Sequence, residues 1–445
     1  MKIGFISTRL AGTDGVSLET HKWAEVVGRL GHEIFYCAGE LDADSPPGLL
    51  VPQMHFTHPE AKQIHDLAFG SITQAPHLKS RIALSAANLK AQLSAFINDF
   101  QIDLVIAQNL FAIPMHIPLG VALREVLIET GLPAIAHNHD FYWERERFQI
   151  NCIPDILEIT FPPDLPNLRH AVINSLAQRD LKARRGIESV VIPNVFDFDT
   201  PAPGIDDYSA DLREAIGLSD DDRLILQPTR VVPRKGIELA IELVSKLQMA
   251  NCKLCMTHHA GDEGMDYLHQ LQGQAAVAGI DLCYVADRFG SQRGTAADGR
   301  KIYSLWDAYP HADFVTYPSL YEGFGNALVE AIYFRLPALV NRYPVYKADI
   351  GPLGFDFVEV DGEITSKAIS EVRRLLDDPD RRQTAVDRNY ALARRHFSYD
   401  VLEQALERLV LPPSQLKLSR PTRLGMDCGD NRRRADVSDL SAPEE

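Results

Sequence analysis

The sequence predicts an α/β protein built from two doubly wound parallel sheets. Its first forty residues carry the clearest pattern: an apolar run at residues 2–8, a glycine-containing loop, helical spacing of apolar residues over 18–30, and a second apolar run at 33–37. This strand–loop–helix–strand order is typical of parallel sheets with crossover helices. Similar short apolar runs, which we expect to be buried strands, recur at residues 103–107, 133–137, 171–174, 189–192, 223–227, 253–257, 281–284, 313–317 and 337–340.

A change in composition divides the chain into two halves. Residues 199–222 are rich in proline and acidic residues, and we expect them to link two domains. The expected domains are an N-terminal Rossmann-like domain over residues 1–205 and a second one over 206–395. A helix over 396–411 follows. Residues 412–445 show little apolar periodicity and are expected to form a disordered tail.

Length and charge exclude several classes of function. The 445 residues carry a net charge of −16, which on average repels nucleic acids and anionic membranes. The chain has six scattered cysteines, an N-terminus unlike a signal peptide and no apolar run of about 18–20 residues. We therefore expect a cytoplasmic protein with reduced thiols, without nucleic-acid or integral membrane contacts. The sequence leaves homo-oligomerisation open.

The strongest motif places two glutamates around a strand-to-helix turn. Glu322 and Glu330 flank a run that contains Gly323 and Gly325 and that follows the expected strand at 313–317. Glycines let the backbone approach a ligand closely, and the N-terminus of the next helix favours negative charge. The motif is therefore a candidate site for a phosphate or a sugar hydroxyl. Taken alone, it also fits an ordinary turn with two solvated acids.

Two further loops are expected at the same edge of the sheets. Arg230 and Lys235 follow the first strand of the second half, where they can neutralise a diphosphate. Alone, they also fit a basic surface turn. Gly15 lies in the loop after the first strand, which lacks both the dinucleotide glycine pattern and the P-loop lysine. That loop can still present backbone N–H groups to a phosphate.

A fourth candidate surrounds His139, after another expected strand. His139 can hydrogen-bond a sugar hydroxyl, and Arg145 and Arg147 can hold an anionic acceptor. The two arginines also fit a solvated face on which they pair with Glu144 and Glu146.

Three clusters resemble metal sites but lack their full pattern. Asp42 and Asp44 precede a Ser-Pro-Pro loop and are an acidic pair by coincidence. Cys252 and Cys255 lie in an expected strand, and the chain has no second Cys-x-x-Cys. The paired histidines of the His139 segment lack two further ligands. No metal site is therefore expected.

Together, these motifs resemble those of the retaining glycosyltransferases of family 4, which have the GT-B fold of two Rossmann-like domains. The resemblance covers roughly residues 1–411. Its most specific part is the pair Glu322 and Glu330, joined in order to Arg230 and Lys235 upstream.

The resemblance implies a role for each motif residue. Glu330 is expected to bind the ribose hydroxyls of a nucleotide, and Glu322 the hydroxyls of the donor sugar. Arg230 and Lys235 are expected to hold the diphosphate, and His139 to contact the donor sugar. With Glu322, these last three residues are the expected catalytic residues. The remaining expected contacts are the backbone N–H groups of Phe324, Gly325 and Asn326 for the donor, and Gly15 for both the diphosphate and the acceptor.

The implied reaction is transfer of a hexose from UDP-glucose or GDP-mannose to a small soluble, anionic acceptor, without a cofactor or metal. Residues 4–17 and 139–147 are most similar to enzymes that make compatible-solute glycosides such as mannosylglucosylglycerate, and to the catalytic part of sucrose-phosphate synthases. The acceptor is then a sugar phosphate or a glycosylglycerate, held by Arg145 and Arg147. A polysaccharide or lipid-linked acceptor is an alternative, as is a two-domain sugar-binding protein without catalysis. A nicotinamide dehydrogenase is disfavoured because its glycine pattern is missing.

Overall fold

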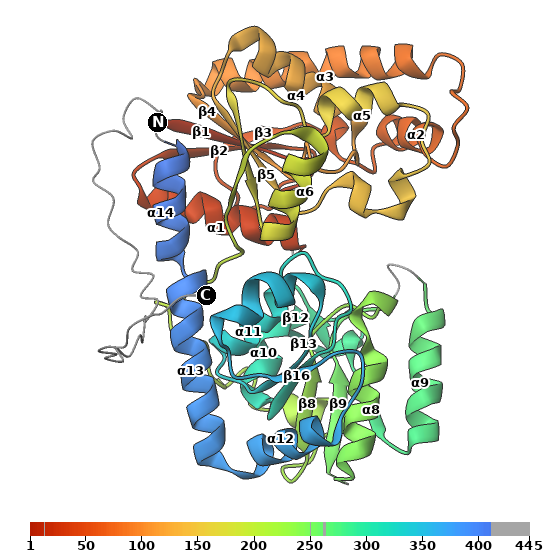
Figure 1. Ribbon diagram of the computed structural model, residues 1–445, viewed down its shortest axis with the longest axis vertical. Coiled ribbons are helices and arrows are strands. Elements are labelled where there is room, and N and C mark those ends of the chain that lie inside the picture. Colours follow the sequence, from red (N-terminus) through yellow and green to blue (C-terminus); the bar gives the residue numbers. More distant parts are fainter. Residues whose placement is uncertain (13, 250, 261–263, 411–445) are drawn as a thin grey trace, which may run out of the picture.

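The computed structural model describes residues 1–12, 14–249, 251–260 and 264–410, and shows two α/β halves stacked along the long axis of the molecule (Figure 1). The first half is built on a seven-stranded parallel sheet in the order β3-β2-β1-β4-β5-β6-β7. Its strands are β1 (Lys2–Ile6), β2 (Glu33–Ala38), β3 (Gly48–Leu50), β4 (Leu104–Gln108), β5 (Ala134–Asn138), β6 (Leu168–Val172) and β7 (Ser189–Val191).

The second half contains a six-stranded parallel sheet in the order β10-β9-β8-β14-β15-β16. Its strands are β8 (Arg223–Gln227), β9 (Cys252–Met256), β10 (Asp281–Tyr284), β14 (Phe314–Tyr317), β15 (Ala338–Asn341) and β16 (Val358–Val360). A small separate sheet is formed by β11 (Phe289–Gly290), β12 (Gly294–Thr295) and β13 (Lys301–Ser304). The prediction of two doubly wound parallel sheets is confirmed.

Helices cover both faces of each large sheet. Those of the first half are α1 (Gly15–Arg29), α2 (Pro59–Ala68), α3 (Leu78–Phe100), α4 (Ile117–Thr130), α5 (Pro154–Thr160) and α6 (Ser175–Arg185). Those that follow are α7 (Leu212–Ala215), α8 (Ile237–Leu247), α9 (Asp266–Ala278), α10 (Leu305–Ala308), α11 (Asn326–Tyr333), α12 (Ser366–Asp377), α13 (Pro379–Phe397) and α14 (Tyr399–Val410).

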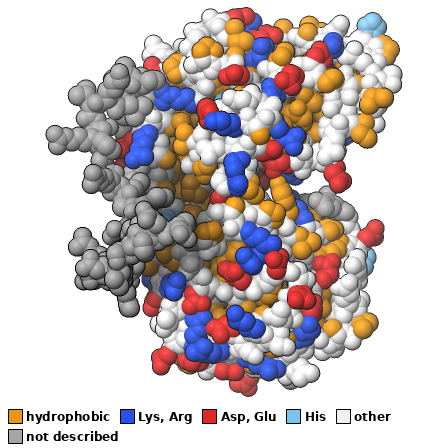
Figure 2. Space-filling model, viewed as in Figure 1, with side chains coloured by type: hydrophobic (Ala, Val, Ile, Leu, Met, Phe, Trp, Pro, Cys, Tyr) orange, Lys and Arg blue, Asp and Glu red, His pale blue; other side chains and the backbone are white. Residues whose placement is uncertain are grey.

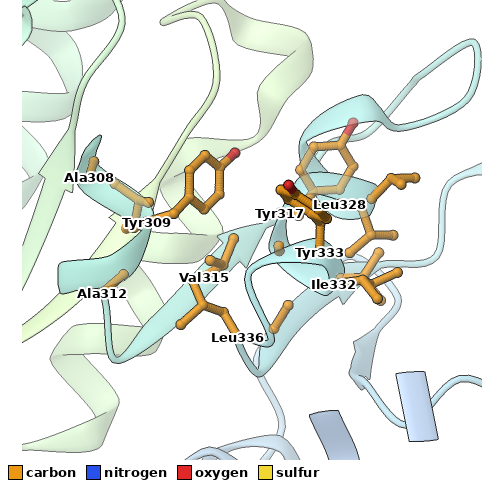
Figure 3. Close-up of a cluster of buried hydrophobic side chains, with 14 of the residues drawn as sticks. Ala308, Tyr309, Ala312, Val315, Tyr317, Leu328, Ile332, Tyr333 and Leu336 are labelled. Carbon is orange, nitrogen blue, oxygen red and sulfur yellow. The ribbon is translucent and has the colours of Figure 1, made fainter. Parts of the chain in front are cut away.

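Successive strand residues point to opposite faces and build separate cores. In β4, Val105 belongs to a core with α3 and α4, whereas Ile106 belongs to one with α1 and α14. In β14, Phe314 packs with α8, α9 and α12, and Val315 packs against the apolar side of α11. Figure 3 shows part of this cluster, with Val315 of β14 and Leu328 and Ile332 of α11 labelled. α11 is thereby fixed against its sheet, with its N-terminus at the strand ends.

The order of strands reverses between β1 and β4 in the first sheet and between β8 and β14 in the second. Ligands of such sheets bind at these reversal points, outside the carboxyl ends of the strands. The loops after β1, β8 and β14 hold the glycine loop, the arginine–lysine motif and the two-glutamate motif, respectively. The topology therefore brings the strongest sequence motifs to the ligand-binding edges.

The chain passes between the halves around residues 192–198 and again at the junction of α13 and α14. The backbone N–H of Phe196 donates to the carbonyl of Phe397 (2.8 Å), so the two crossings lie side by side. α14 then packs on α1 of the first half (Figure 1), where the hydroxyl of Tyr399 donates to Glu25 (3.3 Å).

The linker expected at residues 199–222 belongs instead to the body of the second half. Leu212, in α7, is fully buried in the core that α11 and α13 share. The segment contains three buried apolar side chains, Leu212, Ile216 and Leu218, which lie in α7 and directly after it. The polar and proline-rich composition around them led to the prediction of a linker. The expected tail at residues 412–445 lies outside the described residues.

We predict that Leu406→Ala, in α14, destabilises the first half by about 2–5 kcal/mol, because it leaves a cavity in a core where Leu406 is fully buried. Denaturant unfolding measures the loss. The matched control is Glu407→Ala, the next residue, whose side chain is exposed. Equal stability of the two variants would show that α14 is not part of the core of the first half.

Candidate functional site

The helix after β14 begins at a position that only glycine can occupy. Gly325 has φ 138°, and a Cβ atom there lies 2.6 Å from the hydroxyl of Tyr343. That hydroxyl donates to the carbonyl of Phe324 (2.5 Å) and fixes the turn. Gly325 caps α11 without a side-chain hydrogen bond. The first N–H groups of this helix are therefore available to an anionic or hydroxyl ligand.

Glu322 and Lys235 form a buried ion pair beside this helix terminus. The ammonium of Lys235 donates to Oε1 of Glu322, and Arg234 donates to Oε2 (3.2 Å). Burial on its own raises the pKa of Glu322, but the charges of Lys235 and Arg234 outweigh it and hold that pKa below its usual value. Burial lowers the pKa of Lys235, and Glu322 offsets this only in part. The carboxylate of Glu322 is thus ionised, and its two hydrogen bonds fix its orientation.

The loops that carry this pair are packed backbone to backbone. Gly236 has φ 59°, and a Cβ atom there lies 2.5 Å from the carbonyl oxygen of Pro318. The N–H of Leu320 donates to the carbonyl of Arg234 (2.8 Å). The glycine of the Arg-x4-Lys-Gly motif is therefore needed so that the loops after β8 and β14 can touch.

Two further cationic or titratable side chains lie around Lys235. Arg230 is exposed at the end of the β8 loop, close enough that its charge helps to lower the pKa of Lys235. His258 follows β9, and burial together with the charges of Lys235 and Arg230 lowers its pKa to about 4. Arg234 and His258 were not singled out as ligand contacts by the sequence, although Arg234 adjoins Lys235.

Glu330 lies about one turn into α11, where the charges of Lys22 and Glu19 of the first half act on it. It accepts a hydrogen bond from the hydroxyl of Tyr309 (2.6 Å). Burial raises its pKa above the usual value, although the bond from Tyr309 and the charge of Lys22 oppose the shift. Lys22 comes from α1, where it donates to Glu19 (2.6 Å) and to the carbonyl of Val195 (2.7 Å).

His139 is one of the residues of the first half that lie next to the loop after β14. A Cβ atom on Gly323 lies 3.5 Å from the carbonyl oxygen of His139. Asn109 accepts from the backbone N–H of His139 (3.0 Å) and sets the direction of the loop. Burial lowers the pKa of His139 to about 4, and its Nε2 atom is buried without a partner among the described residues. The imidazole is thus neutral near pH 7 and has an unused polar atom.

The two candidate acceptor arginines do not pair with the adjacent glutamates as the solvated-face alternative proposed. Arg145 pairs with Asp140 (2.5 Å), and Arg147 contacts the sulfur of Met115 (3.2 Å). Burial lowers the pKa of Arg147. Glu144 instead accepts from Tyr321 of the second half (2.5 Å).

Several hydrogen bonds join the two halves across the site. Asn174 donates to the carbonyl of Gly323 (2.7 Å), and Asn194 donates to the side-chain oxygen of Asn326 (2.7 Å). In the space-filling view the halves meet across a narrow cleft, and charges of both signs mix on the face shown (Figure 2). The loops at the carboxyl ends of both sheets therefore form a single site.

The structure shows contacts for two of the clusters that resembled metal sites. Asp42 accepts from the N–H of Gly12 (3.0 Å) and so holds the glycine loop. Cys255, in β9, faces Cys283 in the neighbouring strand. Among the described residues there is no group of three histidine, cysteine or acidic side chains arranged to hold a metal ion. None of the helices in the described part of the chain is long and apolar enough to cross a membrane.

Comparison with curated proteins finds two similar relatives. The chain is 35% identical to the mannosylglucosylglycerate synthase of Thermotoga maritima, over 93% of this chain and 100% of that protein. It is 34% identical to the enzyme of the same name from Petrotoga mobilis, over 81% and 86% of the two chains. No known protein-family profile matches the chain.

Solved structures with the same fold include the sucrose-phosphate synthase of Thermosynechococcus elongatus, with a TM-score of 0.62 and 15% identity over 92% of this chain and 98% of that one. An Anabaena protein crystallised with UDP and glucose also has a TM-score of 0.62, with 16% identity over 92% and 99%. These likenesses confirm the expected GT-B fold, and the relatives confirm the expected resemblance to mannosylglucosylglycerate synthases.

We predict that Lys235→Met destabilises the protein by about 3–5 kcal/mol, because it leaves the carboxylate of Glu322 buried beside Arg234 alone. The double variant Lys235→Met/Glu322→Met should recover most of this loss, since no buried charge is left unpaired. Denaturant unfolding measures both. The control is Lys246→Met, at a more exposed i,i+4 pair with Glu242. A double variant no more stable than Lys235→Met alone would contradict a coupled pair.

We also predict that stability falls as the pH drops from 6.5 toward 4. Burial holds the pKa values of His116, His139, His170 and His258 at about 4, well below the ordinary value of 6.5. The unfolded chain therefore binds protons first, so stability is complete above pH 6.5 and decreases below it. His170→Asn should flatten the slope by roughly 1.4 kcal/mol per pH unit. Urea unfolding between pH 7.5 and 4.5 tests this, and parallel curves for variant and wild type would refute it.

Proposed function

Since the chain belongs to the mannosylglucosylglycerate synthase family of glycosyltransferases, we propose that it transfers a hexose from UDP-glucose or GDP-mannose to a hydroxyl of a small, anionic, soluble acceptor such as glucosylglycerate. One observation carries the proposal beyond family membership. The fixed carboxylate of Glu322 lies shortly before the N-terminus of α11, whose N-cap residue, Gly325, has no side chain to cap it. A nucleotide sugar has hydroxyls and a diphosphate that suit these two neighbouring features.

In the proposed donor complex, the diphosphate lies at the N-terminus of α11. The N–H groups of Phe324, Gly325 and Asn326 and the positive end of the helix dipole face its oxygens. Arg230 and Lys235 supply positive charge at the same edge. The charge of the leaving diphosphate is thus balanced by the chain's own residues, and we propose that no metal ion is needed.

The two glutamates are proposed to bind the two sugar units of the donor. Glu322 is held by Lys235 and Arg234, and its carboxylate accepts from the hydroxyls of the hexose. Glu330 lies further along α11 and accepts from the ribose hydroxyls, while Tyr309 fixes one of its oxygens. The relatives' name and the Anabaena complex with UDP and glucose leave both GDP-mannose and UDP-glucose as donors.

We propose that the reaction retains the configuration of the transferred sugar. The bond between the anomeric carbon and the phosphate oxygen breaks, and the acceptor oxygen bonds to the same face of that carbon. The acceptor's proton passes to the departing phosphate oxygen. The neutral imidazole of His139 positions the hexose, and the α11 terminus with Arg230 and Lys235 stabilises the charge that develops on the phosphate.

The acceptor is proposed to lie against the first half, between the Gly15 loop and the segment with Arg145 and Arg147. Arg147 has no carboxylate within ion-pair distance among the described residues, and burial lowers its pKa. A carboxylate of the acceptor would pair with the guanidinium and stabilise its charged form. We further propose that the enzyme works in the cytoplasm, where nucleotide sugars are made available to soluble acceptors.

We predict tight binding of one nucleoside diphosphate, UDP or GDP, by calorimetry, and transfer from the matching donor to glucosylglycerate by mass spectrometry. NMR of the new glycosidic bond should show the anomeric configuration of the donor, and EDTA should leave the rate unchanged. Glu322→Gln should lower kcat by about 10²–10³, the range found when one preorganised polar group is removed.

The effect of Glu322→Gln is compared with that of Glu330→Gln, because Glu330 is proposed to bind the ribose and not the hexose that is transferred. Glu330→Gln should raise the KM for the donor more than it lowers kcat. A product with inverted anomeric configuration would refute the retaining mechanism. No detectable binding of either UDP or GDP in the calorimetric titration would refute the donor site. Transfer to a polysaccharide or lipid-linked sugar in preference to glucosylglycerate would refute the proposed acceptor.

A further inference from the structure

A lysine of the first half, Lys22 in α1, lies where the two halves meet. Its ammonium donates to Oε1 of Glu19 (2.6 Å) and to the carbonyl of Val195 (2.7 Å), in the segment that crosses between the halves. It also lies over the ring of Phe196, 5.0 Å from the centroid. An ammonium has three N–H donors, and among the described residues these two oxygens are its hydrogen-bond acceptors. One N–H of Lys22 therefore remains without an oxygen acceptor.

The ion pair of Lys22 and Glu19 presents its positive end to a ligand. The side chain of Glu19 has 0% of its surface exposed, whereas that of Lys22 keeps 16%. Burial raises the pKa of Glu19, and the charge of Lys22 opposes that shift. A ligand that reaches the pair therefore meets the ammonium, with the carboxylate behind it. In the second half, Lys235 is held in a similar way by the buried carboxylate of Glu322.

α1 is fixed against the strand that leads to His139. The ring of Trp23, the residue after Lys22, stacks on the ring of His137 with 3.9 Å between the centroids. The ring of His137 in turn lies 4.5 Å from that of His139. Burial lowers the pKa of His139 to about 4, and the charge of Lys22 adds to the shift. Lys22 is thus within electrostatic reach of the residue that is proposed to position the hexose.

On its other side, Lys22 faces α11 of the second half. The ring of Phe196, which lies beneath the ammonium, packs on Tyr333 of α11 with 4.5 Å between the centroids. Burial raises the pKa of Glu330, in the same helix, and the charge of Lys22 opposes the shift. Lys22 is thus also within electrostatic reach of the residue that is proposed to bind the ribose.

The order of groups in a nucleotide sugar decides what lies beside this ammonium. The diphosphate joins the hexose to the ribose, so a cation within reach of both His139 and Glu330 lies next to the diphosphate. The N-terminus of α1 does not supply this positive charge, because Asp14 caps it and occupies backbone N–H groups at its start. The positive charge from the first half then comes from Lys22, further along the helix.

We propose that Lys22 binds the diphosphate of the donor from the first half, with Glu19 orienting its ammonium. The diphosphate is then held from both walls of the cleft, because Arg230 and Lys235 face it from the second half. This inference rests on the proposed function and adds to it a residue of the opposite wall. Negative charge grows on the phosphates as the bond to the hexose breaks, so Lys22 contributes to kcat as well as to donor affinity.

The test compares two ligands that differ only by the diphosphate, UDP against uridine or GDP against guanosine, according to the base that the wild type binds. Calorimetry measures the diphosphate, and NMR titration measures the weaker nucleoside. Lys22→Met should weaken diphosphate binding by roughly 10–100-fold, the range for a hydrogen bond to a charged group. It should weaken nucleoside binding by less than about twofold, because the nucleoside lacks the group that Lys22 contacts. Lys22→Arg, which keeps the charge, should recover most of the loss.

Two further variants separate the charge of Lys22 from its role as an anchor. Lys22→Gln is uncharged but can still donate to the carbonyl of Val195, and it should behave as Lys22→Met does. Lys246→Met is the matched control, since Lys246 also donates to a glutamate of its own helix, Glu242 (2.5 Å), and to a backbone carbonyl, that of Ile364 (2.9 Å). Lys246 lies in α8 near α12, at the end of the second half away from the first (Figure 1). Lys246→Met should change neither affinity.

Equal weakening of diphosphate and nucleoside binding in both uncharged Lys22 variants would show that Lys22 only anchors the crossing segment. That result overturns the inference and leaves the proposed function intact, as does unchanged binding of both ligands. If Lys22→Met does not fold, as judged by thermal melting, the comparison is made with Lys22→Gln under the same criteria. Binding of neither UDP nor GDP by the wild type overturns the proposed function, and this inference with it.

Discussion

The buried pair of Lys235 and Glu322 holds together the two loops on which the cleft depends. The loops follow β8 and β14, the strands between which the order of the second sheet reverses. Removing both charges from water is costly, and their attraction repays that cost only with good geometry and further hydrogen bonds. Arg234 supplies one of these, and the backbone contact at Gly236 supplies the close approach. The pair thus specifies the position of one carboxylate more than it adds stability.

A fixed carboxylate beside an open helix terminus creates a site with two different preferences. Glu322 accepts hydrogen bonds, and the N–H groups at the start of α11 donate them. A ligand with hydroxyls at one end and a diphosphate at the other satisfies both, whereas a simple anion or a simple polyol satisfies only one. This asymmetry is the reason for proposing a nucleotide sugar as the ligand of the second half, and the proposal does not depend on which base or hexose the donor carries.

The sequence was sufficient to predict the two large parallel sheets, apart from their short edge strands β3 and β16, and the meeting of the main motifs. Buried parallel strands are short apolar runs, and the residues after them must gather at one edge, so the proximity of Glu322 and Lys235 follows from the strand pattern. The ion-pair partner of Arg145 could not be predicted from the sequence. Asp140 and Glu144 are both close to Arg145 along the chain, and only the fold of the loop decides which of them pairs with it. The expected linker at residues 199–222 was wrong because composition alone does not reveal that Leu212 is buried.

The two halves contribute differently to the proposed reaction, in a way that bears on where a proton goes. In the proposed complex, Arg230 and Lys235 of the second half face the diphosphate, while His139 of the first half is neutral near pH 7. With a pKa of about 4, His139 is a weaker base than a phosphate oxygen, whose second pKa is about 6. In the proposed mechanism, we therefore expect the acceptor's proton to pass more readily to the departing phosphate than to the histidine. A first half with a basic histidine would compete for that proton, and the burial of His139 removes the competition.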